Sequence, residues 1–157
     1  MLGKLAPHHR EKLAKLIAAT PEFTPDDASV ALELVDAALG HPDSDEYRFI
    51  LCEEADRVLG FACFGSASMA EGSFDLYWMV VDRETRRRGI GREILFAVEQ
   101  ELRAEGARLI RLETAGIDSY RAARAFYERT GYAEAGRILD FYWPGNDLHI
   151  YVKYLAA

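Results

Sequence analysis

One short segment of the sequence combines glycines with a high density of arginines. Between Asp82 and Arg92, five arginines stand against two acids, a local charge of +3 in a chain whose formal net charge is -7. The five are Arg83, Arg86, Arg87, Arg88 and Arg92. The segment follows an apolar run and opens a helical stripe, with Gly89 and Gly91 at the junction. Free N–H groups at a helix start, approached closely through glycine, predict a phosphate or pyrophosphate site.

Two considerations weigh against an anion site in this segment. Arginines at a helix start are commonly solvated, and a Gly-x-Gly pair alone is weak evidence. However, cations at a helix N-terminus oppose the helix dipole, so three consecutive arginines carry a cost that a bound anion would offset. The segment lacks the Gly-Lys-Ser/Thr of a Walker loop and the third glycine of the Rossmann fingerprint. We therefore favour an anion site of another kind.

Asp75 is the only carboxylate in the apolar run Phe74 to Val81. Strand alternation predicts that it shares a face with Tyr77, Met79 and Val81. Apolar neighbours disfavour the charged form of a carboxyl group, which suits a general base acting through a water molecule. The alternative is a solvated residue at the start of the strand. Both interpretations remain open at this stage.

The elements that position these residues follow from hydrophobic periodicity and turn signals. Helices are predicted around Leu13 to Ile17 and over Thr24 to Gly40, Gly89 to Ala104 and Ser119 to Thr130. Strands are predicted over Tyr47 to Cys52, Val58 to Phe64, Phe74 to Val81, Leu109 to Leu112, Tyr132 to Tyr142 and Leu148 to Leu155. The order ααβββαβαββ predicts an α/β (α+β) fold: a mixed sheet of about six to seven strands flanked by about four helices.

Composition narrows the class of protein further. The chain has 157 residues, half of them hydrophobic, so we expect one domain over residues 1–157. No apolar run approaches the roughly 20 residues that span a bilayer, and no apolar signal core follows Met1. Cys52 and Cys63 predict free thiols in a cytoplasmic protein. The acidic balance argues against nucleic-acid binding, and the four histidines lack the spacing of metal ligands.

Two motifs resemble landmarks of the GNAT superfamily of N-acetyltransferases. The segment Arg86 to Gly91 is similar to that family's pyrophosphate loop, Gln/Arg-x-x-Gly-x-Gly/Ala. The segment Ala123 to Tyr132 is similar to its second landmark, Ala-x-x-Leu/Phe-Tyr-x-x-x-Gly-Phe/Tyr. The two occur in the family's order and at its separation, so together they are more specific than either alone.

The resemblance implies a V-shaped opening between two central strands that admits acetyl-CoA. Pantetheine would run along Met79, Val80 and Val81. The pyrophosphate would bind a loop made of Arg86, Arg87, Arg88, Gly89, Ile90, Gly91 and Arg92. Tyr127 falls on the tyrosine that protonates the departing sulfur in many members, although a helix-borne tyrosine can also serve only in packing. Tyr120 stands where many members carry an asparagine that contacts the cofactor.

These observations predict an N-acetyltransferase that moves an acetyl group from acetyl-CoA to a primary amine of a small molecule or a peptide. Tyr127 would be the general acid and Asp75 the base, with Glu113 as a second candidate base. The alternatives are a CoA-binding module without catalysis and a nucleotide-binding regulatory domain. No metal, nucleic acid or membrane partner is expected. A homodimer through the last strands is common among such folds.

Overall fold

One sheet of seven strands runs through the protein. The computed structural model describes residues 1–155 and orders the strands β1-β2-β3-β4-β5-β7-β6. The strands are β1 (Leu2–Lys4), β2 (Arg48–Glu54), β3 (Arg57–Ser66), β4 (Ser73–Val81), β5 (Leu109–Ala115), β6 (Ala133–Trp143) and β7 (Asn146–Tyr154). The helices are α1 (Arg10–Ala18), α2 (Pro25–Gly40), α3 (Ile90–Ala104) and α4 (Arg121–Arg129), with three short 3-10 turns, η1 (Pro7–His9), η2 (Arg83–Thr85) and η3 (Asp118–Tyr120).

The sheet is mixed, as predicted. Neighbouring strands are antiparallel except for β4 and β5, which are parallel and are linked through α3. The predicted order of elements is confirmed, with one addition. The strand β1, paired with β2 from Leu2↔Cys52 to Lys4↔Ile50, was not predicted because its three residues carry no alternating pattern.

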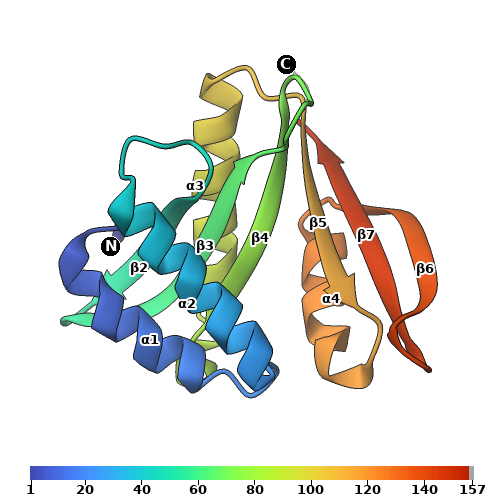
Figure 1. The fold of residues 1–157 in the computed structure, drawn as a ribbon, viewed down its shortest axis with the longest axis horizontal. Coiled ribbons are helices and arrows are strands. Elements are labelled where there is room, and N and C mark those ends of the chain that lie inside the picture. The colour runs from blue at the N-terminus through green and yellow to red at the C-terminus, as the bar shows by residue number, and fades with distance from the viewer. Residues whose placement is uncertain (156–157) are drawn as a thin grey trace.

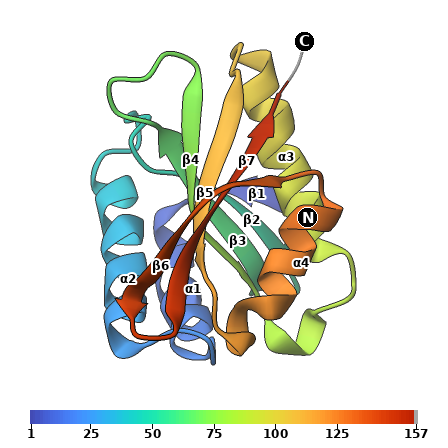
Figure 2. The same cartoon turned by 90° about the vertical axis from the view of Figure 1, so that its right-hand side faces the viewer.

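Helices cover the two faces of the sheet unequally (Figures 1 and 2). On one face α1 and α2 pack on β2, β3 and β4, around buried residues such as Leu13, Val35 and Phe61. On the other face α3 and α4 pack on the middle of the sheet, around residues such as Ile94, Leu112 and Tyr151. No residue of β5, β6 or β7 that the structure describes belongs to the α1–α2 cluster, so that face of these three strands is left uncovered.

Local chemistry explains where α2 begins. The Thr24 hydroxyl accepts a bond from the Asp27 N–H at 3.1 Å, the Asp27 carboxylate accepts one from the Thr24 N–H at 2.9 Å, and Pro25 occupies the first turn. This reciprocal capping box confirms the start predicted from sequence. The strand β3 is buried from Val58 to Gly65, because helices cover both of its faces.

Two predicted boundaries need correction. The helix predicted over residues 119–130 is divided into η3 and α4, because Tyr120 ends the tighter turn before the α-helix begins. The last two strands are joined by only two residues, Pro144 and Gly145, and Gly145 adopts the left-handed φ of 87° that such a tight connection favours. Among the helices that the structure describes, none combines the length and apolar character needed to cross a lipid bilayer.

Candidate active site

The strands β4 and β5 are paired over only part of their length. Their register runs from Ser73↔Leu109 to Leu76↔Leu112. Beyond that point β4 continues to Val81 and β5 to Ala115 without pairing, and the two strands diverge (Figure 1). The backbone groups that face each other across this opening need other partners. The V-shaped opening implied by the sequence is thus present at the predicted strand.

A β-bulge at Tyr77 separates the two halves of β4. The pairing with β3 steps from Phe64↔Leu76 to Cys63↔Trp78, which leaves Tyr77 as the extra residue. Tyr77 and Trp78 both pack toward α1 and α2, whereas Leu76 and Met79 pack toward α3 and α4. The prediction that Asp75 shares a face with Met79 and Val81 was therefore wrong: the bulge reverses the alternation between them.

The second half of β4 presents free backbone to the opening. The Asp82 N–H donates to the Leu59 carbonyl of β3 at 2.8 Å. Alternate residues of an antiparallel strand bond the same neighbour, so Met79 and Val81 direct their N–H and C=O groups to the other side, where β5 has diverged. The Val80 side chain is buried beneath α1 and α2. The Arg86 Nε donates to the Val81 carbonyl at 3.4 Å, so the Met79 backbone and the Val81 N–H are the groups that the opening could offer to an extended ligand.

The turn before α3, residues 86–92, is the candidate anion-binding loop. Gly89, with φ of 84°, is the N-cap of α3 and has no side chain to satisfy the helix. The first bond of α3 runs from the Glu93 N–H to the Gly89 carbonyl at 3.0 Å. The N–H groups of Gly89, Ile90, Gly91 and Arg92 have no partner among the described residues. Four free donors at a positive dipole end make a site for a phosphate group.

Gly91 allows this loop to lie directly on β4. A Cβ atom at Gly91 would meet Met79 Cε and Val81 Cγ2 at 3.3 Å and Phe126 Cε2 at 3.6 Å. The free N–H groups therefore lie beside the strand that offers free backbone, and α4 closes the other side. Any larger residue at Gly91 would push α3 away from both.

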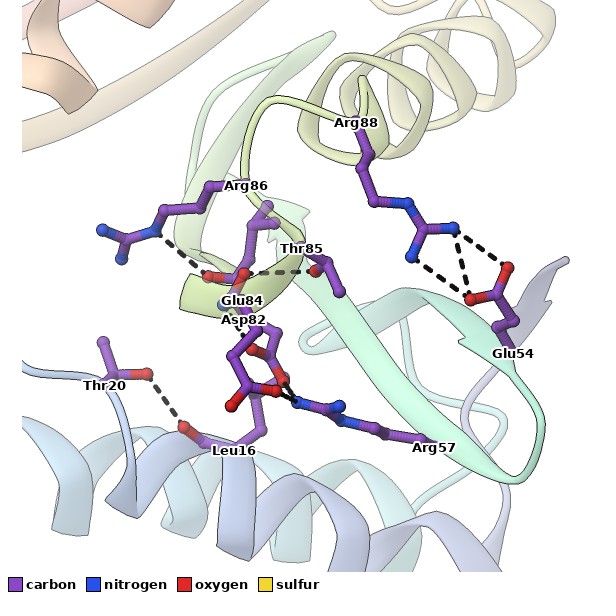
Figure 3. A network of polar contacts seen from close by, with 10 residues as sticks. Leu16, Thr20, Glu54, Arg57, Asp82, Glu84, Thr85, Arg86 and Arg88 are labelled. Carbon is purple, nitrogen blue, oxygen red and sulfur yellow. Dashed lines mark hydrogen bonds and ion pairs between the residues drawn. The ribbon is translucent and has the colours of Figure 1, made fainter.

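Arg86 and Arg88 hold the loop through ion pairs with other segments, and Figure 3 shows the pair that Arg88 makes. The Arg86 guanidinium pairs with Glu22, between α1 and α2, at 2.8 Å, and Arg88 pairs with Glu54 at the end of β2 at 3.0 Å. Arg87 and Arg92 have no ion pair among the described residues. Backbone donors, rather than all five guanidinium groups, therefore dominate the anion site.

A cavity of about 240 Å³ lies beside Arg86, at the start of this loop. Its lining includes the end of α1 and the charged groups Arg57, Asp82 and Arg86. Arg57 is already bonded to Asp82 and Glu84, and the Glu84 N–H donates to the Asp82 carboxylate at 2.9 Å (Figure 3). These charges satisfy one another, so the cavity has no evident ligand chemistry.

Tyr127 lies on the face of α4 that covers the opening. Its ring is buried, with Phe126 at 5.5 Å and Tyr132 at 5.7 Å between ring centroids. Burial raises the pKa of Tyr127 above its usual value, and its hydroxyl bonds to none of the described residues. The group is therefore a protonated phenol with an uncommitted proton at neutral pH. Arg124 holds α4 to the end of β5 by donating to the Ile117 carbonyl at 3.1 Å.

Tyr120 ends η3 and lies against the connection between α1 and α2. Its hydroxyl donates to the Glu22 carbonyl at 3.2 Å, so it holds the connection between α1 and α2. Burial, with the nearby charges of Asp27 and Glu22, raises the pKa of Tyr120 to about 12. Tyr142, from the end of β6, adds to that rise, and its own pKa is raised by burial and then by the charges of Glu113 and Asp27. Four separate segments thus meet at this edge.

Two carboxylates occupy the uncovered face at the opening. Asp75 lies directly opposite Arg111 in the paired half, and the Arg111 Nε donates to the Asp75 Oδ1 at 2.7 Å. Glu113, two residues further along β5, lies beyond the last paired residues and is exposed, with no ion pair to any described residue. Sequence reasoning did not anticipate the role of Arg111, although it is the only charge in the run Leu109–Leu112.

His8, His9 and Glu53 form the one group among the described residues whose spacing could hold a metal ion. The hydrogen bonds of these residues disfavour metal binding. The His9 Nδ1 accepts a hydrogen bond from the Ala6 N–H at 3.0 Å, which places the proton of the neutral ring on Nε2, the atom that faces Glu53. The Lys12 ammonium also occupies the Glu53 carboxylate, at 2.5 Å.

Comparison with known proteins identifies the family. A model of the acetyltransferase (GNAT) family matches residues 11–132. An acetyltransferase of the GNAT family from Desulfovibrio desulfuricans is 36% identical, with a TM-score of 0.95 and an alignment that covers 99% of both chains. The chain therefore belongs to the acetyltransferase (GNAT) family and is an acyltransferase. A search of curated proteins finds no significant match.

More distant structures share the fold. The ribosomal-protein-S18-alanine N-acetyltransferase of Escherichia coli is 19% identical, with a TM-score of 0.78, and the alignment covers 100% of this chain and 94% of that one. An aminoglycoside 6'-N-acetyltransferase complexed with coenzyme A is 18% identical, with a TM-score of 0.79 and coverage of 100% and 98%. Acetyl-CoA, as predicted, is the acyl donor of the family.

Proposed function

We propose that the protein transfers the acetyl group of acetyl-CoA to a primary amine by direct attack of the amine on the thioester. The observation that supports this proposal is that three sets of groups without partners among the described residues lie on the elements around the β4–β5 opening. These are the N–H groups of Gly89 to Arg92, the Met79 backbone with the Val81 N–H, and the hydroxyl of Tyr127. They fit a diphosphate, an amide-bearing arm and a thiolate, in that order.

The chemistry requires two proton transfers. When bound, acetyl-CoA supplies the acetyl group as a thioester. The amine nitrogen forms a bond to the carbonyl carbon, the carbon–sulfur bond breaks, and Tyr127 donates its proton to the sulfur. The raised pKa of Tyr127 keeps that proton available at neutral pH. Backbone N–H groups along the second half of β4 would stabilise the carbonyl oxygen as it gains charge.

The proton lost by the amine goes to a carboxylate on the uncovered face. Asp75, the candidate from sequence, would act through a water molecule, because its Oδ1 is held by Arg111. Glu113 is the second candidate, because it lies beyond the paired half and has no partner among the described residues. Variants of both residues, described below, separate the two.

The acceptor class proposed is a small-molecule or peptide amine, entering over the uncovered face of β5, β7 and β6. Tyr120, Tyr142, Asp27 and Glu113 border this entrance. A cytoplasmic location and a homodimer also remain proposals. The first is supported by the free, buried thiols of Cys52 and Cys63. The second is supported by the edge strand β6, where Leu139, Phe141 and Trp143 are exposed.

Isothermal titration with acetyl-CoA tests the donor, with Gly91→Val as the disrupted site. We expect micromolar binding that the variant loses, since the added side chain separates α3 from β4. Gly3→Val is the matched control, because a side chain there meets nothing within 4 Å. Thiol release in a screen of primary amines then tests transfer. If the native protein bound no acetyl-CoA, the proposal would be wrong. If it bound acetyl-CoA but released no thiol with any amine, it would be only a CoA-binding protein.

A further inference from the structure

Arg124 lies on the helix that carries Tyr127. This helix, α4, has nine residues and lies beside β5 and β7 (Figure 1), and the Tyr127 ring is 6.4 Å from that of Tyr151 between centroids. A helix this short is not stable by itself, so its contacts with the sheet fix its position. Arg124 precedes Tyr127 by three residues, so the two side chains leave the same side of the helix, about 4.5 Å apart along its axis. What holds Arg124 therefore also places Tyr127.

The carbonyl of Ala115, the last residue of β5, faces the β4–β5 opening. The Gly116 N–H donates to the Asp147 carbonyl of β7 at 2.9 Å. Ala115 is paired with Leu148 and alternates with Gly116, so its own N–H and C=O groups point away from β7, to the side of β4. The strand β4 has diverged at this level, so the Ala115 carbonyl has no neighbouring strand to bond.

Arg124 supplies the partner that this carbonyl lacks. Its Nη1 donates to the Ala115 carbonyl at 2.5 Å and to the Ile117 carbonyl at 3.1 Å. The guanidinium makes no ion pair with any residue that the structure describes, so its charge serves these two carbonyls. Hydrogen bonds from a charged donor are stronger than those between neutral groups. Arg124 thus ties the first half of α4 to the edge of the opening.

A second arginine on the same helix lacks this link. Arg121, three residues earlier, pairs at 2.7 Å with Asp118 of the preceding turn η3, and both side chains are exposed. The far end of α4 is tied to β7 instead, where the Tyr151 hydroxyl donates to the Glu128 Oε1 at 3.0 Å. Among the described side chains of α4, Arg124 is therefore the one that hydrogen-bonds β5.

We propose that Arg124 is a positioning residue for the general acid. By holding α4 to the Ala115 carbonyl, it sets how far the Tyr127 hydroxyl reaches toward the opening, where the sulfur would leave. The inference rests on the proposed function, because it takes Tyr127 as the proton donor. It adds that the rate of transfer depends on a side chain that acts through Tyr127, and that this side chain also occupies a carbonyl left free by the divergence of the strands.

A double-mutant cycle in kcat tests this inference. Arg124→Met keeps the length of the side chain and removes its donors. We expect it to lower kcat by about tenfold or more, as misplacement of a reacting group does, while the affinity for acetyl-CoA stays within about threefold. In the Tyr127→Phe background the same change should lower kcat by less than about twofold, since no proton donor remains to be misplaced. Arg124→Lys, which keeps a donor, should restore much of the rate.

The outcomes separate this inference from the proposed function. Arg121→Met is the matched control and should leave kcat unchanged. If Arg124→Met lowered kcat equally in both backgrounds, or not at all in the native one, the inference would be overturned and the proposed function would stand. If Tyr127→Phe kept the native kcat, or the native protein transferred no acetyl group, both would be wrong.

Unfolding midpoints show whether each variant is folded at the temperature of the assay. Should Arg124→Met fail to fold, Arg124→Lys is carried through the same cycle. It is expected to give a smaller fall in kcat that also disappears in the Tyr127→Phe background. A fall that persisted there would overturn the inference.

Discussion

The two halves of β4 and β5 are built from the same strands but differ in every interaction that matters for function. In the first half the strands are hydrogen-bonded, the buried Leu76 and Leu112 pack under α3 and α4, and Arg111 neutralises Asp75. In the second half the pairing of β4 with β5 has ended, the Met79 backbone and the Val81 N–H lack partners among the described residues, and the Tyr127 hydroxyl makes no hydrogen bond to them. The contrast indicates that the first half supplies stability and that the second half holds the candidate reactive site.

Tyr127→Phe, which changes the second half, should have the largest effect, and that effect is on the rate of transfer. Removing the proton donor is expected to lower kcat by about 10²–10³, within the range of general acid catalysis, while the affinity for CoA stays unchanged. The ring packing with Phe126 and Tyr132 persists, so the unfolding midpoint should change little. Steady-state kinetics with titration calorimetry checks this. A kcat close to native would mean that sulfur leaves without help from this residue.

Leu112→Ala, which changes the first half, should instead reduce the stability of the protein. Leu112 is 3% exposed, and its truncation is expected to reduce the free energy of unfolding by about 2–5 kcal/mol. Met79→Ala, in the second half and only partly buried, should cost less stability but more CoA affinity. Urea unfolding and calorimetry of both variants give the comparison. If Met79→Ala proved the more destabilising of the two, the division of roles between the halves would not hold.

Glu113→Gln and Asp75→Asn sharpen the comparison at the boundary between the halves. We expect Glu113→Gln to lower kcat by about 10², the lower end for loss of a general base. Asp75→Asn should lower it by less than about fivefold, equivalent to the ~1 kcal/mol contributed by an exposed ion pair. Kinetics at saturating acetyl-CoA measures both. The reverse ranking would assign the base to Asp75 acting through water.

The smallest effect is expected from Glu22→Gln, which releases the anion-binding loop from the connection between α1 and α2. Burial would raise the pKa of Glu22, but Arg86 lowers it below its usual value. A carboxyl group whose pKa is lowered on folding stabilises the folded protein at pH values above its unfolded pKa of about 4.3. That stability is lost as the pH falls through the pKa of the folded state. The pair is partly exposed, so the variant should lose about 0.5 kcal/mol at neutral pH.

Urea unfolding checks the Glu22 prediction. It is measured for the Glu22→Gln variant and the native protein, at neutral pH and at about pH 3. The difference between the two proteins should shrink on acidification, because native Glu22 then carries no charge either. A difference that stayed constant with pH would point to packing rather than charge as its cause.

Much of the fold could be predicted because its signals are local. The Thr24–Pro25–Asp27 start of α2, the apolar strands and the segment Arg86–Gly91 each depend on neighbours within a few residues. The order of elements followed from them and is confirmed, while the anion-binding role of residues 86–92 stays a prediction. Resemblance to the family then supplied Tyr127, which periodicity alone leaves as a packed aromatic.

Interactions between distant segments could not be predicted in the same way. The pair of Asp75 and Arg111 joins residues 36 apart, and that of Arg86 and Glu22 joins residues 64 apart. The bulge at Tyr77 depends on the register of β3, which no pattern within β4 reveals. One signal was available: Asp75 and Arg111 are lone opposite charges in two apolar runs, which favours their pairing across adjacent strands.

The bulge at Tyr77 also has a consequence for how β4 tolerates changes in length. The halves of the strand are out of phase by one residue, so losing any single residue near Tyr77 would restore regular alternation. Both halves would keep their present partners on β3, so Met79 and Val81 would keep their side chains toward α3 and α4 and their backbone groups toward the opening. A one-residue deletion at Tyr77 is therefore expected to remove the bulge and leave the candidate donor site in place, whereas a one-residue insertion after Val80 would turn the residues that follow it to the opposite faces.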